Sequence, residues 1–137
     1  MPEIREFSLA SRLESVDEAA MLADKFAKSV GLDEEFIYAL DLAVRESVAN
    51  AVKHGNKFDE SKDVKLTFAD SGGLFSITVR DFGSGFDVDE VPDPTDPENL
   101  LKSNGRGILF MNSFMDSVEW ENASDGGLVV KMTKKHG

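Results

Sequence analysis

Cysteine is absent from this chain of 137 residues, and basic residues are scarce beside acidic ones. Without cysteine the protein has no disulfide framework and no thiolate metal site. Because 15 Lys and Arg stand against 26 Asp and Glu, the formal net charge is −11. This balance argues against nucleic acid or a membrane surface as the main partner, since both are recognised through clustered Lys and Arg.

Long hydrophobic runs are also missing. No run approaches the roughly 20 apolar residues that a membrane helix needs, and the opening MPEIREFSLA lacks the pattern of a signal peptide. We therefore expect a cytoplasmic protein. A hydrophobic content of 41% suffices for a packed core, and the length suits one domain over residues 1–137. An enzyme, a ligand-binding module and an acidic protein that holds a basic partner all remain open.

The first half of the chain has the periodicity of two helices. Ser15 and Glu18 have the spacing of a capping box, and apolar residues recur at helical spacing over 19–30. Gly31 is a suitable stop. A second helix is expected from Asp33 to about residue 54, closed by Gly55.

Alternating apolar and polar residues predict strands over 3–9, 64–68 and 75–79, the last two joined as a hairpin through Ser71-Gly72-Gly73. Further elements are expected at 108–115 (helix), 116–121 (strand), 123–127 (turn) and 128–132 (strand). This order predicts an α+β fold, a two-layer sandwich with helices on one face of a mainly antiparallel mixed sheet.

A first group of polar residues lies on the second predicted helix. Glu46 and Asn50 are four residues apart and share one helix face, and Lys53 and His54 continue that stripe. Such a stripe is usually a solvated face. However, Asn50 stands among small apolar residues, where its amide needs a partner, and one candidate is a metal ion.

A second group is the segment from Asp81 to Gly85, with the sequence Asp-Phe-Gly-Ser-Gly. Asp81 has the same parity as the apolar residues of its strand, so we expect it to face the core. A carboxylate is costly there unless it accepts strong hydrogen bonds. An Asx-type turn is one interpretation. The other is a carboxylate at the bottom of a pocket, accepting from an exocyclic amine such as that of adenine, where Gly83 and Gly85 let the backbone approach a flat ring.

A third group follows a stretch from 82 to 105 that is rich in proline, glycine and acids and has no helical or strand periodicity. A loop of this length is usually a functional lid or an unstructured segment. Gly105, Arg106 and Gly107 come next and lead into a predicted helix, whose N-terminus suits an anion. A loop-to-helix hinge is the alternative.

Taken in order, these three groups resemble the N, G1 and G2 boxes of the GHKL (Bergerat-fold) ATPase superfamily. The segments 91–101 and 105–116 resemble in particular the anti-sigma-factor serine/threonine kinases of bacteria, and the resemblance spans nearly the whole chain. It implies a single ATP-binding kinase domain over residues 1–137, with ATP and Mg²⁺ as ligands and residues 87–104 as the ATP lid.

The resemblance also implies residue roles. Glu46 would be the general base that activates a Ser or Thr hydroxyl of a partner protein, Asn50 would bind the Mg²⁺ that bridges the triphosphate, and Asp81 would accept from the adenine amine. The other implied nucleotide contacts are Lys53, Gly83, Gly85, Phe86, Gly105, Arg106 and Gly107.

The implied partners are a sigma factor and an anti-sigma antagonist that carries the phosphorylated residue, with no direct contact to nucleic acid or membrane, and a homodimer is implied as well. One alternative is a nucleotide-gated partner-binding protein without kinase activity. Another is a detached histidine-kinase ATP domain, for which the sequence shows no phosphoacceptor helix.

Overall fold

The computed structural model describes residues 3–83, 114–123 and 126–136. The predicted lid at 87–104 lies outside these residues, and so does almost all of the helix predicted at 108–115. In the described part of the chain, no helix is both long and apolar enough to cross a membrane.

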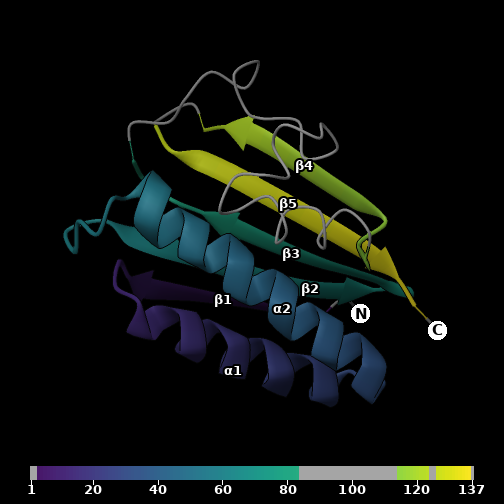
Figure 1. Cartoon of the computed structure of the whole chain (residues 1–137). Helices are drawn as coiled ribbons and strands as arrows, with labels where there is room; N and C mark the ends of the chain where they lie inside the picture. The colour runs from purple at the N-terminus through teal and green to yellow at the C-terminus, as the bar shows by residue number, and fades with distance from the viewer. Residues whose placement is uncertain (1–2, 84–113, 124–125, 137) are drawn as a thin grey trace, which may run out of the picture.

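The described elements are β1 (Glu3–Ala10), α1 (Glu14–Ser29), α2 (Glu34–Asn50), η1 (Ala51–Gly55), β2 (Asp63–Ser71), β3 (Leu74–Arg80), β4 (Ser117–Asn122) and β5 (Leu128–Lys135). The five described strands form one sheet in the order β1-β2-β3-β5-β4. Each pairing between them is antiparallel. Figure 1 shows α1 and α2 on one face of this sheet, which confirms the predicted two-layer α+β fold.

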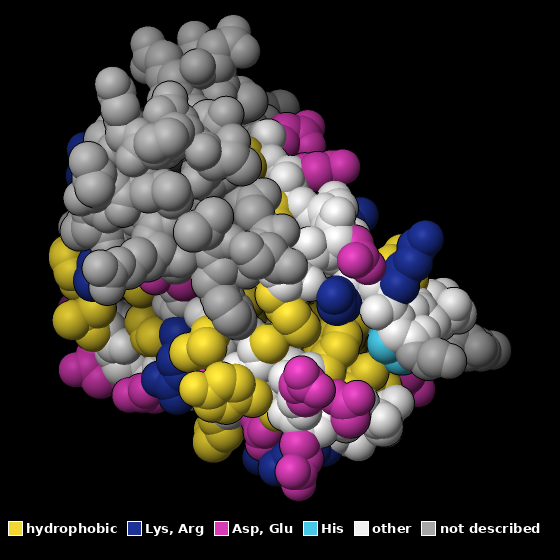
Figure 2. Space-filling model, turned by 45° about the vertical axis from the view of Figure 1, so that its right-hand side comes forward, with side chains coloured by type: hydrophobic (Ala, Val, Ile, Leu, Met, Phe, Trp, Pro, Cys, Tyr) yellow, Lys and Arg dark blue, Asp and Glu magenta, His cyan; other side chains and the backbone are white. Residues whose placement is uncertain are grey.

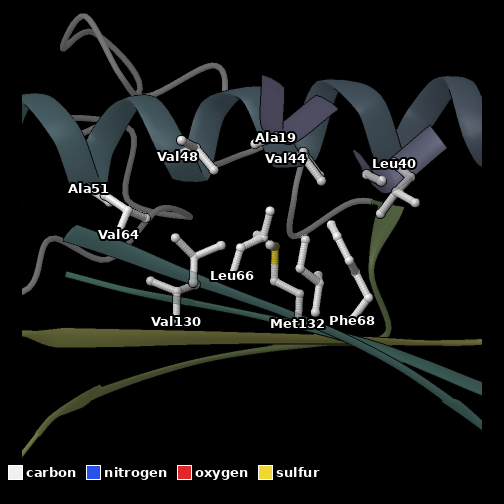
Figure 3. Close-up of a cluster of buried hydrophobic side chains, with 14 of the residues drawn as sticks. Ala19, Leu40, Val44, Val48, Ala51, Val64, Leu66, Phe68, Val130 and Met132 are labelled. Atoms are coloured by element: carbon white, nitrogen blue, oxygen red, sulfur yellow. The ribbon is translucent and has the colours of Figure 1, made fainter. Parts of the chain in front are cut away.

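The core fills the space between the helices and the sheet (Figure 3). Alternate residues of β2 and β3 point inward, and the stripe of α2 lies over them, because a strand repeats every two residues and a helix every 3.6. The side chains that are fully enclosed come from both layers: Leu40, Val44, Val48, Val64, Leu66, Phe68, Phe75 and Ile77, each 0% exposed.

The predicted capping box at the start of α1 is wrong. The helix begins at Glu14, before Ser15, and no side chain caps it. The connection from β1 is so short that Ser15 already lies in the first turn and faces the core. Its hydroxyl donates to the carbonyl of Ala10 at 2.6 Å, so it satisfies the end of β1 instead of the helix N-terminus.

The start of α2 is as predicted. Asp33 is the N-cap, and its carboxylate accepts from the backbone N–H of Phe36 at 2.8 Å. Gly31, with φ of +80°, terminates α1 three residues after Lys28. The connection between the two helices is therefore short, and both Gly31, which ends α1, and Asp33, which begins α2, were predicted from the sequence.

The end of this helix differs from the prediction. The α-helix stops at Asn50, and the chain continues as a π-helix, η1, to Gly55. The N–H of Asn56 donates to the carbonyl of Ala51 at 2.8 Å, a hydrogen bond that spans five residues. This wider turn brings Gly55 against the end of β3. Single π turns of this kind occur frequently at functional sites.

The predicted hairpin is confirmed. β2 and β3 are joined through Gly72 and Gly73, which have φ of +56° and +84°. The strands predicted at 116–121 and 128–132 are β4 and β5, each slightly displaced or longer than expected. β5 lies between β3 and β4, so its first residues reach the end of β3, where Asp81 follows.

Candidate functional site

Asp81 lies directly after β3 and points inward, as its parity predicts, with 4% of its surface exposed. Its backbone N–H donates to the carbonyl of Leu128 at 3.0 Å. Its Oδ1 accepts from the backbone N–H groups of Gly83 and Leu128, both at 3.1 Å. One carboxylate oxygen is therefore fixed by two donors from two different segments.

The other oxygen, Oδ2, lies against the end of η1. A Cβ added at Gly55 would come within 2.1 Å of Oδ2, and a Cβ at Gly83 within 2.0 Å of the Gly55 carbonyl oxygen. A side chain at Gly55 would displace the side chain of Asp81, and one at Gly83 would require movement of the backbone at Gly55. No hydrogen bond between described residues reaches Oδ2. The site thus has one anchored oxygen, Oδ1, and a second oxygen, Oδ2, that packs against Gly55 without a hydrogen-bond partner among the described residues.

Gly127 completes this close packing. Its φ is +92°, and a Cβ there would lie 2.1 Å from the carbonyl oxygen of Asp81. From the sequence, Gly127 was expected in a turn, with no part in the site. Its role depends on β5 lying next to β3, which the local sequence does not specify.

Burial raises the pKa of Asp81 above its ordinary value, and the N–H groups of Gly83 and Leu128 oppose that rise by stabilising the charged form. The charges of Arg80 and Lys62 act in the same direction as these N–H groups. The carboxylate is thus kept in a partly desolvated place, where a hydrogen bond to a ligand is stronger than it is in water.

Glu46 and Asn50 are one turn apart on α2, as predicted. The Oε1 atom of Glu46 is buried and has no hydrogen-bond partner among the described residues. Burial raises the pKa of Glu46, while the hydrogen bond with Asn50 and the charges of Lys53 and His54 lower it. A carboxylate with a raised pKa and an oxygen without a hydrogen-bond partner has properties that suit a general base.

The structure brings the first two sequence groups together through Gly55. That residue ends the helical segment that carries Glu46 and Asn50, and it contacts Asp81 at the end of β3. Figure 1 shows the end of α2 beside the point at which the chain leaves β3. Lys53 projects from η1 with an exposed side chain. Five predicted contacts lie outside the described residues: Gly85, Phe86, Gly105, Arg106 and Gly107.

Asn56 is a second residue whose role in the site was not predicted from the sequence. Its side chain is 2% exposed, and its amide bonds three other segments, including the backbone N–H of Phe82 at 2.8 Å. The sequence signal was a polar residue directly after the glycine that ends the helix. Nothing local distinguishes such a residue from an exposed one.

The chain belongs to the family of histidine kinase-like ATPase domains, whose model matches residues 9–134. This match confirms the family resemblance that the three boxes indicate. The catalytic domain of the histidine kinase ThkA has the same fold, with a TM-score of 0.60 over 98% of this chain and 97% of that chain, at 16% identity.

More particular likenesses come from named proteins. The chain is 32% identical to the serine-protein kinase RsbW of Halalkalibacterium halodurans, over 97% of this chain and 83% of that protein. It is 34% identical to the anti-sigma F factor of Heyndrickxia coagulans, over 96% and 89%. It is 32% identical to the serine-protein kinase RsbW of Bacillus subtilis, over 79% and 70%.

Proposed function

We propose that this protein is an ATP-dependent serine/threonine protein kinase that acts as an anti-sigma factor in a partner-switching pathway. It binds a sigma factor, and it phosphorylates an anti-sigma antagonist. Family membership and relatives named as serine-protein kinases and anti-sigma F factors support this function. The structural observation that carries it is the buried Asp81, with Oδ1 anchored and Oδ2 left beside Gly55.

Asp81 suits the adenine base. Oδ2 accepts a hydrogen bond from the exocyclic amine, while Oδ1 keeps its two backbone donors, so recognition needs no rearrangement of the carboxylate. Gly55 and Gly83 have no side chains, so the end of η1 packs directly against Asp81 and holds the carboxylate in place. The proposed nucleotide site is completed by Lys53, Gly85, Phe86, Gly105, Arg106 and Gly107.

Asn50 fits a magnesium ion that accompanies ATP. Among the described residues there is no group of three or more acidic or histidine side chains that could hold a metal by itself. Mg²⁺ does not need one, because it commonly keeps several waters and takes one or two protein oxygens together with substrate phosphates. When bound, it would neutralise charge on the triphosphate. The amide oxygen of Asn50 is the protein ligand that we propose.

Glu46 acts as the base toward the partner's hydroxyl. Its unpartnered Oε1 accepts the proton as the hydroxyl oxygen bonds to the γ-phosphorus, and the bond from that phosphorus to the leaving ADP oxygen breaks. Because burial raises the pKa of Glu46, the proton is held more firmly than by an ordinary exposed glutamate. The anionic form, which is the active form, is present above that raised pKa.

A transfer assay tests the assignment. Purified protein is incubated with Mg²⁺, γ-labelled ATP and a candidate antagonist. Glu46→Gln should bind ATP normally and transfer no label, whereas Asn50→Ala should lose Mg²⁺-dependent ATP binding. Glu35→Gln is the matched control, because Glu35 is an exposed carboxylate on the same helix and should transfer normally. Normal transfer by Glu46→Gln would overturn the assignment of the base.

The second candidate is a nucleotide-gated binder that transfers no phosphate. Glu46 favours the kinase, because a pure binder has no use for a buried carboxylate oxygen without a partner among the described residues at this point. Pull-down from the source cell with Mg·ATP or Mg·ADP separates the two. A kinase anti-sigma factor retains a sigma factor with ATP and an antagonist with ADP, and it labels the antagonist. A binder without kinase activity retains the same partners with each nucleotide but does not label the antagonist.

The charge of the surface bears on the partners. Figure 2 shows Asp and Glu side chains spread over the described face, while the Lys and Arg side chains on it stand apart from one another. With a net charge of −11, the protein should attract basic partner patches and associate faster at low salt. We further propose that the protein acts in the cytoplasm and that it forms a homodimer. Light scattering, which measures the mass of the assembly in solution, tests the dimer.

A further inference from the structure

The amide of Asn56 ties together four parts of the chain at the edge of the candidate site. Its Oδ1 accepts from the backbone N–H of Phe82 at 2.8 Å. Its Nδ2 donates to the hydroxyl of Ser11 at 2.8 Å and to the carbonyl of Asp63 at 3.1 Å. Ser11 follows β1, Asp63 begins β2, and Phe82 is the second residue after β3. With 2% exposure, this amide is inside the protein.

The bond to Phe82 bears directly on Asp81, the residue before it. The N–H of Asp81 is held by Leu128, at the start of β5, and the next N–H along the chain is held by Asn56 from the end of η1. The peptide groups on both sides of the Asp81 Cα are therefore fixed, each by a different element. Because a side chain leaves the backbone at Cα, these two bonds act together with the two that Oδ1 accepts to set the direction of the carboxylate.

The side chain of Phe82 takes no part in this contact. It packs with Arg80, whose guanidinium carbon lies 4.4 Å from the ring centroid, and only the backbone N–H of Phe82 meets Asn56. Only an amide side chain combines an acceptor for that N–H with donors for Ser11 and Asp63. The donors and the acceptor of the Asn56 amide thus match the hydrogen-bonding groups of Ser11, Asp63 and Phe82.

We propose that Asn56 is a positioning residue for base recognition, which holds Asp81 so that Oδ2 meets the exocyclic amine of adenine. The proposal rests on the proposed role of Asp81 toward ATP and extends it to a residue that touches no ligand. Without the Phe82 bond, the peptide after Asp81 is held only through its neighbours, and the carboxylate is positioned less precisely by the two bonds to Oδ1 that remain.

Base preference is the readout that separates positioning from simple loss of stability. ATP and inosine triphosphate differ at the base, where inosine has a carbonyl in place of the amine. Both affinities are measured by calorimetry with Mg²⁺ on folded wild type and variants, with folding checked by circular dichroism. We expect wild type to prefer ATP, and Asn56→Ala to lose about tenfold of that preference, because a poorly positioned carboxylate keeps only part of its hydrogen bond to the amine.

Two further variants complete the design. Ser15→Ala removes another buried hydrogen bond nearby, from Ser15 to Ala10, and should keep the full preference for ATP. Asn56→Asp keeps an acceptor for the Phe82 N–H and loses the donors, so it should be less stable and still prefer ATP. If Asn56→Ala does not fold, Asn56→Ser takes its place, because the shorter side chain cannot reach the Phe82 N–H and the same loss of preference is expected.

The outcomes are distinct. Full preference in Asn56→Ala, loss of preference in Asn56→Asp, or an equal loss in Ser15→Ala overturns the positioning role while the adenine site stands. Equal affinity of wild type for the two nucleotides overturns the adenine role of Asp81 itself, and with it this proposal. Loss in Asn56→Ala, with preference kept in Asn56→Asp and Ser15→Ala, supports it.

Discussion

Replacing Asp81 by Asn exchanges one atom of the proposed base site and leaves the shape unchanged. The amide oxygen can keep the two backbone donors, Gly83 and Leu128, which now bind Oδ1. The new NH₂ group then stands where Oδ2 stands, beside Gly55. An acceptor for the adenine amine has become a donor facing a donor. The variant should therefore reverse the base preference from ATP toward inosine triphosphate, whose carbonyl accepts.

The magnitude follows from the bonds that change. The variant loses a hydrogen bond to a charged group in a partly desolvated place, worth about 2–3 kcal/mol, or roughly 30- to 140-fold in the Kd for ATP. Folding should suffer little, because the burial that raises the pKa of Asp81 is a cost of the charged form.

The pH dependence of stability gives an independent check. A carboxyl group with a raised folded-state pKa contributes stability that is complete below its ordinary pKa of 3.8 and is lost as pH rises through the raised pKa. Asp81→Asn lacks this contribution. Relative to the variant, wild type should therefore lose free energy of unfolding as pH rises through that window, which urea titrations at several pH values measure.

Calorimetry on wild type and Asp81→Asn with each nucleotide decides the main point. Unchanged ATP affinity in a folded Asp81→Asn protein would refute the reasoning, because the only altered atom would then make no contact with the base. Equal weakening for both nucleotides would place the carboxylate near the ligand without a role in reading the amine.

Three further results are expected. Gly55→Ala should lower the free energy of unfolding by about 1–3 kcal/mol and weaken ATP binding, because its Cβ would lie 2.1 Å from Oδ2 of Asp81. A variant with unchanged urea unfolding and unchanged ATP affinity by calorimetry would contradict this packing. Burial raises the pKa of Glu46 above its ordinary value of 4.5, and only the anion accepts a proton. The rate of phosphate transfer should therefore fall as pH drops through this raised pKa. A rate that stays level through that range would argue against Glu46 as the base. Asp33→Ala should cost about 1 kcal/mol in urea unfolding and leave ATP affinity unchanged, because Asp33 caps α2 far along the helix from Gly55; no loss relative to Asp33→Asn would contradict the cap.

The elements that the sequence predicted well are those governed by local periodicity. The stripe of α2 and the alternation in β2 and β3 depend only on which residues repeat on one face, and Asp33 and Gly31 act within one turn of the chain. The inward direction of Asp81 was predicted on the same ground, since it continues the parity of β3.

The failures have a different origin. Ser15 and Glu18 fit a capping box, yet the short connection from β1 starts the helix before Ser15, so tertiary geometry decides. The π turn after Asn50 leaves no mark in a pattern of apolar residues. Asn56 and Gly127 owe their roles to strands that approach from elsewhere in the chain, and no local signal carries that information.

A crystal structure with Mg²⁺ and a non-hydrolysable ATP analogue would show directly whether Asp81 binds the adenine base. We expect the exocyclic amine of adenine about 3 Å from Oδ2 of Asp81, with the metal bound by the amide oxygen of Asn50. A base bound elsewhere, with Oδ2 of Asp81 making no contact to the nucleotide, would contradict this expectation.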